Sequence, residues 1–223
     1  MNYMPLNTVI FDIDGLLIDS EPQWQKAADE VFQLYGAKLT QEQYNTSVGL
    51  RTKEFVHWWF NHFNIPQTEA ENAEKKMVAL VLQKIETNAA ILPGVTYIFD
   101  FFAKKNFKIG LATSSPQSVI DLVTKMANIE PYLTATASAE ILPFGKPHPQ
   151  VYLNCADKMK SSPLECICFE DSFNGLIAAK AARMKCVVIP HNAVSKEEKW
   201  SIADLKLSSL QNFGELHFNR INQ

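Results

Sequence analysis

Two aspartates separated by one residue follow a short apolar run near the start of the chain. Residues 8–11 have the character of a buried strand and lead directly into Asp12 and Asp14. In an extended backbone, residues i and i+2 point the same way, so both carboxylates can converge at the edge of a sheet. Two like charges about 4 Å apart cost about 4 kcal/mol at an effective dielectric constant near 20. The pair therefore predicts a compensating cation nearby.

A second acidic pair, Glu170 and Asp171, ends another apolar run, and Thr113 and Ser114 follow a third. When such runs are parallel strands, their ends meet at one edge of the sheet, and Lys146 is the obvious cation candidate for that cleft. An excess of carboxylates over lysines indicates a hard divalent cation, and ligation by oxygen alone favours Mg²⁺ over zinc. An isolated Asp-x-Asp is typical of solvated turns. The combination of motifs is what indicates a site.

Short apolar runs and helical patterns alternate along most of the chain, and this alternation must position those side chains. Runs that are apolar on both faces suit a parallel sheet buried by helices. The alternation favours an α/β fold with a doubly wound parallel sheet. The expected strands are residues 8–11, 109–112, 166–169 and 186–189, and the expected helices include residues 97–104, 118–127 and 175–184.

The stretch from about residue 20 to about residue 90 interrupts the alternation, because only helical periods occur in it. It ends at a turn signal, Leu92-Pro93-Gly94. We expect a split catalytic core of residues 1–18 and 91–223 and an α-helical cap domain of residues 19–90, placed to close over the site. The apolar stripes of this segment are Trp24, Ala27, Ala28, Val31 and Tyr35; Phe55, Val56, Trp59, Phe60 and Phe63; and Ala73, Met77, Leu80 and Val81.

Composition and charge exclude several classes of protein. The chain has 223 residues, of which 47% are hydrophobic and 20% charged, as is ordinary for a globular protein. Its 21 lysines and arginines and 24 acidic residues give a net charge of -3, so no basic surplus is available for nucleic acid. No secretory signal or membrane span is recognised. We expect a cytoplasmic monomer with a small-molecule substrate, and four buried, chemically inert cysteines.

In chain order, the chemical motifs resemble the four motifs of the haloacid dehalogenase superfamily. The segment DGLLIDSEP, which starts at Asp14, resembles the branch that contains β-phosphoglucomutase and small sugar-phosphate phosphatases. The resemblance extends through residues 138–158, 170–184 and 203–210, and is weakest in the helical insert. The four motifs are Asp12-Ile13-Asp14-Gly15, Thr113-Ser114-Ser115, Lys146-Pro147 and Glu170-Asp171-Ser172.

The resemblance implies a role for each site residue. Asp12 matches the nucleophile that forms an aspartyl phosphate, and Asp14 matches the general acid that later serves as the base. Lys146 matches the cation that faces the phosphoryl group. The implied substrate-binding residues are Asp12, Asp14, Thr113, Ser114 and Lys146, with Arg51 reaching down from the cap. The implied Mg²⁺ ligands are Asp12, the carbonyl of Asp14 and Asp171, with Glu170 acting indirectly through a water.

Two departures from the pattern favour a phosphatase over a mutase. Trp24 stands where β-phosphoglucomutase has a cap histidine, and Pro116 and Gln117 replace a lysine and an asparagine that hold a second phosphate. The sequence thus predicts Mg²⁺-dependent hydrolysis of small sugar or polyol monophosphates, such as 2-deoxyglucose 6-phosphate or hexitol phosphates. A phosphosugar mutase is the first alternative. A receiver-type signalling domain, which lacks such a helical lid, is the second, and a catalytically silent sugar-phosphate binding protein is the third.

Overall fold

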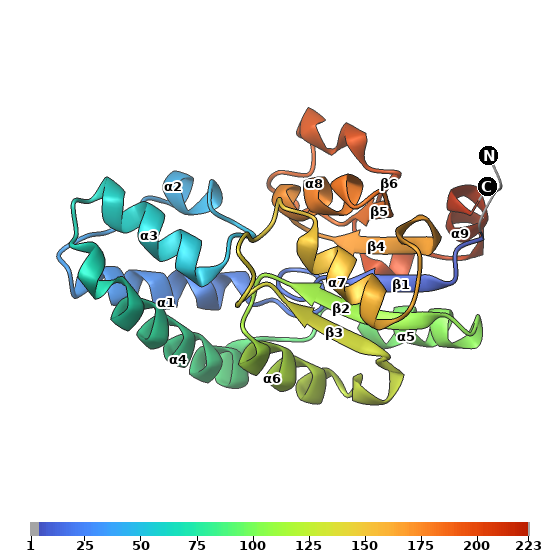
Figure 1. Ribbon diagram of the computed structural model, residues 1–223, viewed down its shortest axis with the longest axis horizontal. Coiled ribbons are helices and arrows are strands. Elements are labelled where there is room, and N and C mark those ends of the chain that lie inside the picture. The colour runs from blue at the N-terminus through green and yellow to red at the C-terminus, as the bar shows by residue number, and fades with distance from the viewer. Residues whose placement is uncertain (1–4, 223) are drawn as a thin grey trace.

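A six-stranded parallel sheet forms the centre of the computed structural model, which describes residues 5–222 (Figure 1). The strand order is β3-β2-β1-β4-β5-β6, and each neighbouring pair is parallel. The chain therefore turns to opposite sides of β1 in its two halves, which creates a switch point where ligands bind at the carboxyl ends of the strands. The strands are β1 Thr8–Phe11, β2 Lys108–Thr113, β3 Ala135–Ser138, β4 Cys166–Glu170, β5 Lys185–Val188 and β6 Leu205–Lys206.

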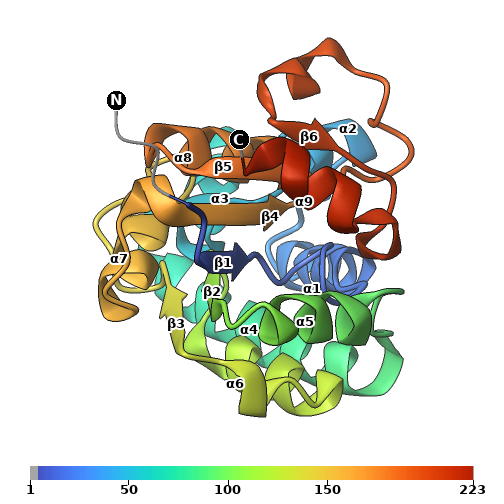
Figure 2. The ribbon, with the colours of Figure 1, turned by 90° about the vertical axis from the view of Figure 1, so that its right-hand side faces the viewer.

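Helices cover both faces of the sheet (Figure 2). Val9 and Phe11 belong to one buried cluster and Ile10 to another, as expected of a strand buried on both sides. Phe11 stacks on Phe99 with ring centroids 4.8 Å apart. One face carries α5 Val95–Lys104, α6 Gln117–Ala127 and α9 Glu215–Ile221, and the other carries α7 Gln150–Lys158 and α8 Phe173–Ala181.

Helices α1 to α4 lie together beyond one end of the sheet (Figure 1). α1 and α3 both pack against α4. The buried face of α1 is the predicted apolar stripe from Trp24 to Val31, and α3 and α4 likewise bury most of their predicted stripes. The bounds are α1 Glu21–Gln33, α2 Gln41–Asn45, α3 Thr52–His62 and α4 Ala70–Asn88.

Two chain segments that lie side by side connect these helices to the sheet. Ile18 and Ile91 form an isolated antiparallel bridge, and the backbone N–H of Leu92 donates to the carbonyl of Leu17 at 2.9 Å. We call this pairing the hinge. It lies at the expected boundaries between residues 1–18 and 91–223 on one side and residues 19–90 on the other. That division into core and cap stays a prediction.

The expected fold class and all four expected strands are confirmed. The two strands that were not expected, β3 and β6, are the edges of the sheet. β3 has the sequence ATAS, is mostly half-buried and lacks the apolar run that marks the central strands. β6 has two residues. Edge strands bury less surface than central ones, so their hydrophobic signal is weaker.

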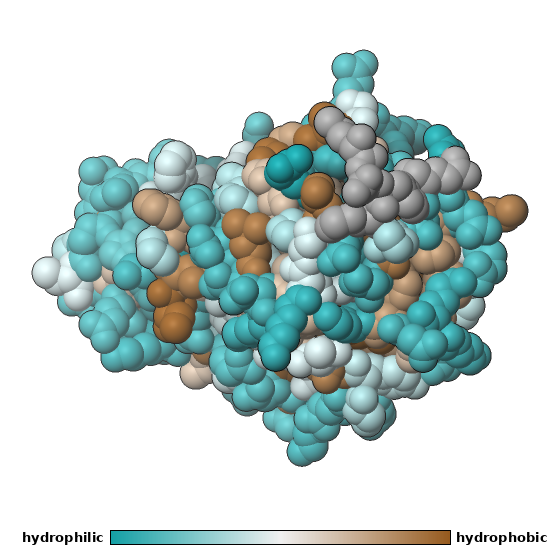
Figure 3. Space-filling view, turned by 45° about the vertical axis from the view of Figure 1, so that its right-hand side comes forward, coloured by the Kyte–Doolittle hydropathy of each residue, from teal (hydrophilic) through white to brown (hydrophobic). Residues whose placement is uncertain are grey.

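Hydrophobic residues on the surface are scattered among polar ones. Figure 3 shows one face, on which hydrophilic residues separate small hydrophobic groups. The most exposed large hydrophobic side chains include Ile141, Trp58 and Leu216. Within residues 5–222, no helix has the length and apolarity needed to cross a bilayer.

Candidate active site

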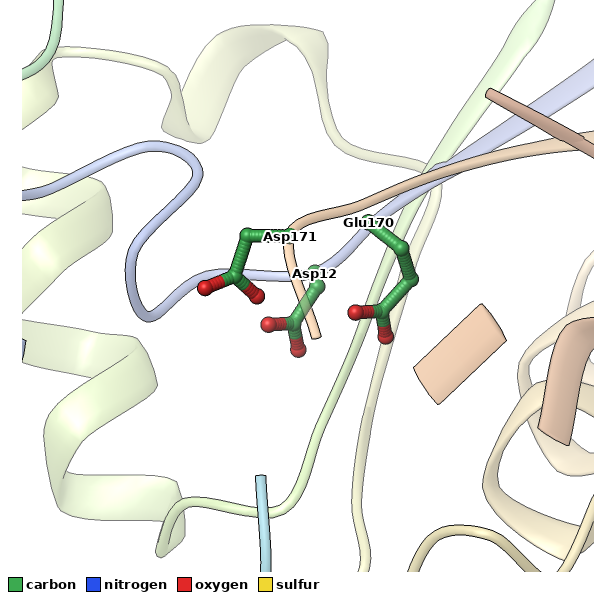
Figure 4. Close-up of side chains that lie close together, drawn as sticks. All are labelled: Asp12, Glu170 and Asp171. Carbon is green, nitrogen blue, oxygen red and sulfur yellow. The ribbon is translucent and has the colours of Figure 1, made fainter. Parts of the chain in front are cut away.

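Three carboxylates meet where β1 and β4 end. Phe11 pairs in register with Phe169, so Asp12 and Glu170, the next residue of each segment, reach the same edge of the sheet. Asp171 follows, and one oxygen of each of the three carboxylates lies within 4.8 Å of the others (Figure 4). The two acidic segments therefore share one edge, as the parallel-sheet argument expected.

Lys146 is the cation between these acids. Its Nζ donates to Asp12 Oδ1 and to Glu170 Oε1, both at 2.6 Å, and to the carbonyl of Ala112 at 3.1 Å. The side chain is 1% exposed. Burial alone would lower the pKa of the lysine, but the two carboxylates raise it above its ordinary value, so the ammonium stays charged.

Glu170 is fully occupied by protein donors. Oε1 accepts from Lys146 and from the hydroxyl of Tyr152, while Oε2 accepts from the backbone N–H of Ser172 at 3.2 Å and from its hydroxyl at 3.0 Å. Ser172 also caps α8 by accepting from the N–H of Gly175 at 3.0 Å. A Cβ at Gly175 would lie 1.9 Å from Glu170 Oε1, so this glycine leaves room for the carboxylate.

The donor set fits a hard divalent cation. Burial raises the pKa of Asp12 and of Asp171 well above the ordinary range, and the neighbouring carboxylates raise both further. Lys146 offsets one of the three charges of the cluster. Within residues 5–222 no hydrogen bond reaches the carboxylate of Asp171, which lies against Gly15 so closely that a Cβ there would be 2.1 Å from Oδ2. An oxygen-only cluster with uncompensated negative charge is a chemical match for Mg²⁺.

Asp14 faces four donors rather than the acidic cluster. Its Oδ1 accepts from the hydroxyl of Ser20 and from the indole Nε1 of Trp24, both at 2.7 Å. Its Oδ2 accepts from the hydroxyl of Ser115 at 2.6 Å and more weakly from that of Thr113 at 3.5 Å. The carboxylate is thus held in one orientation by side chains from both sides of the hinge.

Thr113 and Ser114 end β2 beside the acidic cluster and line the same pocket as Asp12 and Lys146. The hydroxyl of Thr113 accepts from the backbone N–H of Ser115 at 3.0 Å, which fixes the turn. The hydroxyl of Ser114 donates to the carbonyl of Gly49 in the helical insert at 2.8 Å. Both residues stand where the sequence places phosphate donors, and their phosphate-binding role stays a prediction.

Arg51, which the sequence places against the substrate from the insert, is directed at the loop before Lys146, and its substrate contact stays a prediction. It is absent from the residues that line the pocket and is 5% exposed. Its guanidinium donates to Glu54 Oε1 at 2.6 Å and to the carbonyls of Ala139, Leu142 and Pro143. All of these acceptors belong to the protein and take up the two terminal nitrogens, whereas the Nε–H of Arg51 is buried without a partner among residues 5–222.

The insert supplies a largely apolar wall to the pocket. Trp24, Phe55 and Met77 line it together with Glu21 and Tyr44. The hydroxyl of Tyr44 donates to Glu21 at 3.4 Å, a long hydrogen bond. Burial, followed by the charge of Asp14, raises the pKa of Glu21 to about 7. A carboxyl that is protonated near neutral pH can both donate and accept a hydrogen bond, which suits a ligand with hydroxyl groups.

Among the residues that donate to Asp14 and Glu170, four were given no site role from the sequence: Ser20, Trp24, Ser115 and Tyr152. Ser20 and Trp24 lie six and ten residues after Asp14. The sequence placed Trp24 in an apolar stripe and marked it as a departure from a relative, without a role at the site. Ser115 belongs to the same hydroxyl-bearing run as Thr113. Tyr152 sits on α7 with no local motif to mark it.

The cysteines have no role in this site, as expected. All four are free and buried. Burial raises the pKa of Cys155 and of Cys166 to about 12, so neither forms a thiolate at neutral pH.

Comparisons with known proteins identify the family of the chain. A family model described as "haloacid dehalogenase-like hydrolase" matches residues 6–183. Hexitol phosphatase B of Escherichia coli strain K12 is 38% identical over 202 residues, which cover 90% of this chain and 91% of that protein. The "Phosphorylated carbohydrates phosphatase" of Thermotoga maritima is 30% identical and covers 79% of this chain and 82% of its own.

Solved structures share the whole architecture. The β-phosphoglucomutase of Clostridium difficile superposes with a TM-score of 0.86 at 21% identity and covers 97% of each chain. CbbY from Rhodobacter sphaeroides, solved in complex with phosphate, has a TM-score of 0.84 at 22% identity and covers 96% of this chain and 98% of its own. At these identities the similarity establishes the fold.

Proposed function

The chain belongs to the haloacid dehalogenase-like hydrolase family, in which it is a phosphatase, and on that premise we propose that it hydrolyses small sugar or polyol monophosphates. Hexitol phosphates and 2-deoxyglucose 6-phosphate are the substrates that we propose first. The observation that carries the proposal is Asp12. Its carboxylate is buried at the end of β1, with Oδ1 held by Lys146, and it lines a pocket shared with Asp14 and Thr113.

The proposed reaction has two steps. An oxygen of Asp12 attacks phosphorus and forms an aspartyl phosphate, while the bond from phosphorus to the sugar oxygen breaks and Asp14 gives that oxygen a proton. Asp14 then takes a proton from a water molecule that attacks the aspartyl phosphate. This step releases inorganic phosphate and restores Asp12, so atoms and protons balance over the cycle.

The other site residues stabilise charge and hold geometry. Lys146 supports Asp12 and faces the phosphoryl oxygens, and Thr113 and the backbone N–H of Ser114 supply further donors. Asp12, Asp171 and the carbonyl of Asp14 are the residues that would hold Mg²⁺, with Glu170 behind them, and the bound ion would neutralise phosphoryl charge. Removing one such stabilising donor commonly lowers turnover by about 10²- to 10³-fold.

Hydrolysis is favoured over phosphosugar transfer by what stands at the position of the mutase's cap histidine and at the positions of its second phosphate site. The Nε1 of Trp24 is engaged with Asp14, and the side-chain nitrogen of Gln117 donates to Asp121 at 2.8 Å. Pro116 has no N–H to offer and precedes α6 as its N-cap. A mutase must hold a bisphosphate in two orientations, whereas a phosphatase needs one phosphate site and access for water.

A phosphate-release screen over sugar and polyol phosphates, with and without Mg²⁺, tests this function. We expect release to require Mg²⁺ and to fall by on the order of 10⁴-fold or more in Asp12→Asn. Asp19→Asn, at an exposed position seven residues along, is the matched control and should keep full turnover. Full activity of Asp12→Asn, or full activity after exhaustive chelation, would contradict the proposal. Conversion of β-glucose 1-phosphate to the 6-phosphate without phosphate release would identify a mutase.

A further inference from the structure

A short part of the helical insert touches three of the four core segments that carry the proposed phosphate and metal residues. We call residues 48–54, which end in the first turn of α3, the docking segment. The carbonyl of Val48 accepts from Asn174 Nδ2 at 3.1 Å, and that of Gly49 accepts from Ser114. Asn174 follows Asp171 by three residues. The third contact, made by Arg51, reaches the loop before Lys146.

Arg51 and Glu54 together satisfy four backbone groups of residues 139–145, which we call the lysine loop because Lys146 follows it directly. Arg51 donates to three carbonyls of the loop, and Glu54 Oε1 accepts from the N–H of Gly145 at 3.0 Å. In Figure 1 the yellow segment before α7 lies beside the start of α3. Two of these groups, on Ala139 and Gly145, belong to buried residues, whose backbone polar atoms need partners, and two side chains of the insert supply them.

Gly145 lets the two side chains approach its backbone closely. A Cβ at this position would lie 2.5 Å from Glu54 Oε2 and 2.8 Å from Arg51 Nε. The pair itself is mutually braced, since Glu54 also accepts from the backbone N–H of Arg51 at 3.4 Å. Burial opposes ionisation of Glu54, but the hydrogen bonds from Arg51 and Gly145 lower its pKa below the ordinary value, so it is an anion at neutral pH.

We propose that Arg51 and Glu54 are positioning residues that hold the lysine loop, and through it Lys146, when the insert lies against the core. Arg51 thus acts on the enzyme's own backbone rather than on the substrate. The role rests on the proposed function, because Lys146 is assigned there to the phosphoryl group. Lys146 is therefore held in place only when the insert lies against the core, since the side chains that fix the lysine loop come from the insert.

Substrates of different size separate the two roles of Arg51. Acetyl phosphate has no sugar, so an arginine that contacts the sugar does not affect its turnover. A residue that positions Lys146 lowers the turnover of acetyl phosphate and of a sugar phosphate equally, because Lys146 faces the phosphoryl group of both. We expect kcat of Arg51→Ala to fall by about 10- to 100-fold with both substrates. A rise in KM for the sugar phosphate, with unchanged turnover of acetyl phosphate, would show that Arg51 binds substrate and would overturn the proposal.

Two more variants define the unit. Glu54→Gln keeps the shape of the side chain but loses its charge, and we expect it to lower kcat as Arg51→Ala does. In the double variant the losses should not multiply, because both residues act through one loop. Additive losses would contradict this coupling. Lys53→Ala removes an exposed cation between the two positions and is the matched control.

Hydrogen exchange of the lysine loop tests the proposal without any activity measurement. We expect the amide of Gly145 and its neighbours to exchange at least about 10-fold faster in Arg51→Ala and in Glu54→Gln than in the wild-type chain or Lys53→Ala. Unchanged exchange in folded variants of both kinds would overturn the proposal. A third outcome separates the two proposals. If the wild-type chain releases no phosphate in the screen but the two variants still exchange faster than it does, the proposed function is refuted and the loop-holding role stands.

Discussion

The core side and the insert side of the pocket hold their charged groups in different ways. On the core side, Lys146 joins Asp12 and Glu170 through two bonds of 2.6 Å, and the lysine and Glu170 are almost completely buried. On the insert side, the Glu21 carboxylate accepts one long hydrogen bond from Tyr44 and feels the negative charge of Asp14. The first arrangement is rigid and saturated, whereas the second leaves hydrogen-bonding capacity open.

This difference separates the chemistry of the site from its selectivity. Charges that are already fixed in place need no reorganisation during a reaction. The core side, where the charged groups have their hydrogen bonds made, is therefore suited to stabilise the transition state. A wall with one adjustable acid and mostly apolar contacts can accept hydroxylated ligands of more than one shape. We therefore expect substitutions on the core side to change turnover with every substrate, and those on the insert side to act less and more selectively.

The largest expected effect comes from Lys146→Met. Loss of the ammonium leaves Asp12 and Glu170 buried side by side, so we expect kcat to fall by on the order of 10³-fold and the free energy of unfolding by about 3 kcal/mol. Urea denaturation and phosphate release measure the two changes.

The matched control is Lys75→Met, which breaks an exposed pair with Glu71 on α4 and should leave both quantities nearly unchanged. Adding Glu170→Gln to Lys146→Met should restore part of the lost stability, because it removes one of the two stranded charges. If Lys146→Met alone were as stable as the wild type, the ion pairs of Lys146 with Asp12 and Glu170 would not be what stabilises the core side.

Trp24→Phe should have an intermediate effect, because Trp24 belongs to the insert but bonds to Asp14. The indole donates to Asp14 Oδ1 at 2.7 Å, and phenylalanine keeps the aromatic bulk without the donor. Hydrogen bonds to charged groups are worth about 1.5–3 kcal/mol, so we expect kcat to fall by about 10-fold or more with a similar KM. Trp58→Phe, on an exposed tryptophan of α3, should leave kcat unchanged. Equal kcat values for the two variants would contradict a role for the indole in holding Asp14.

The smallest expected effect on turnover comes from Glu21→Gln, whose main signature is in stability. The folded state raises the pKa of Glu21 from 4.5 to about 7, so it favours the protonated form. Below about pH 4.5 the group is protonated in both states and costs nothing. Between about pH 4.5 and pH 7 the unfolded state gives up this proton while the folded state keeps it, so the folded state loses up to about 3 kcal/mol by pH 7, less the relief given by solvent in the pocket.

Urea denaturation at pH 5 and pH 8 measures this cost. Glu21→Gln should gain stability over the wild type, and the gain should be about 2 kcal/mol larger at pH 8 than at pH 5. Glu42→Gln, on an exposed acid of α2, reports the effect of losing one surface charge. If the gain in the free energy of unfolding were larger at pH 5 than at pH 8, the folded state would not raise the pKa of Glu21.

The sequence predicted those parts of the site that depend on local order along the chain. Asp12, Glu170 and Asp171 each follow a run apolar enough to be recognised as a central strand, and the parallel pairing of β1 with β4 then brings them together. Lys146 came from its motif and its charge. The edge strands β3 and β6 were missed because they bury little and carry no apolar run.

What the sequence did not predict depends on how the insert returns to the core. The donors around Asp14 come from Ser20 and Trp24 on one side and from Ser115 on the other, a meeting decided by the hinge and by packing of α1. The orientation of Arg51 has the same origin. Its position in the insert was recognised, but the carbonyls that hold it belong to a loop about 90 residues further along the chain.

The hinge makes the helical insert an exchangeable part. Because Ile18 and Ile91 pair, the chain leaves the core and returns to it at adjacent points. The connection to the core therefore stays the same when the length or sequence of the insert changes. Loop-closure entropy grows slowly, by about 0.6 kcal/mol for each doubling of length. Substrate range can therefore change through the insert while the sheet that carries Asp12 and Asp171 keeps its strand order.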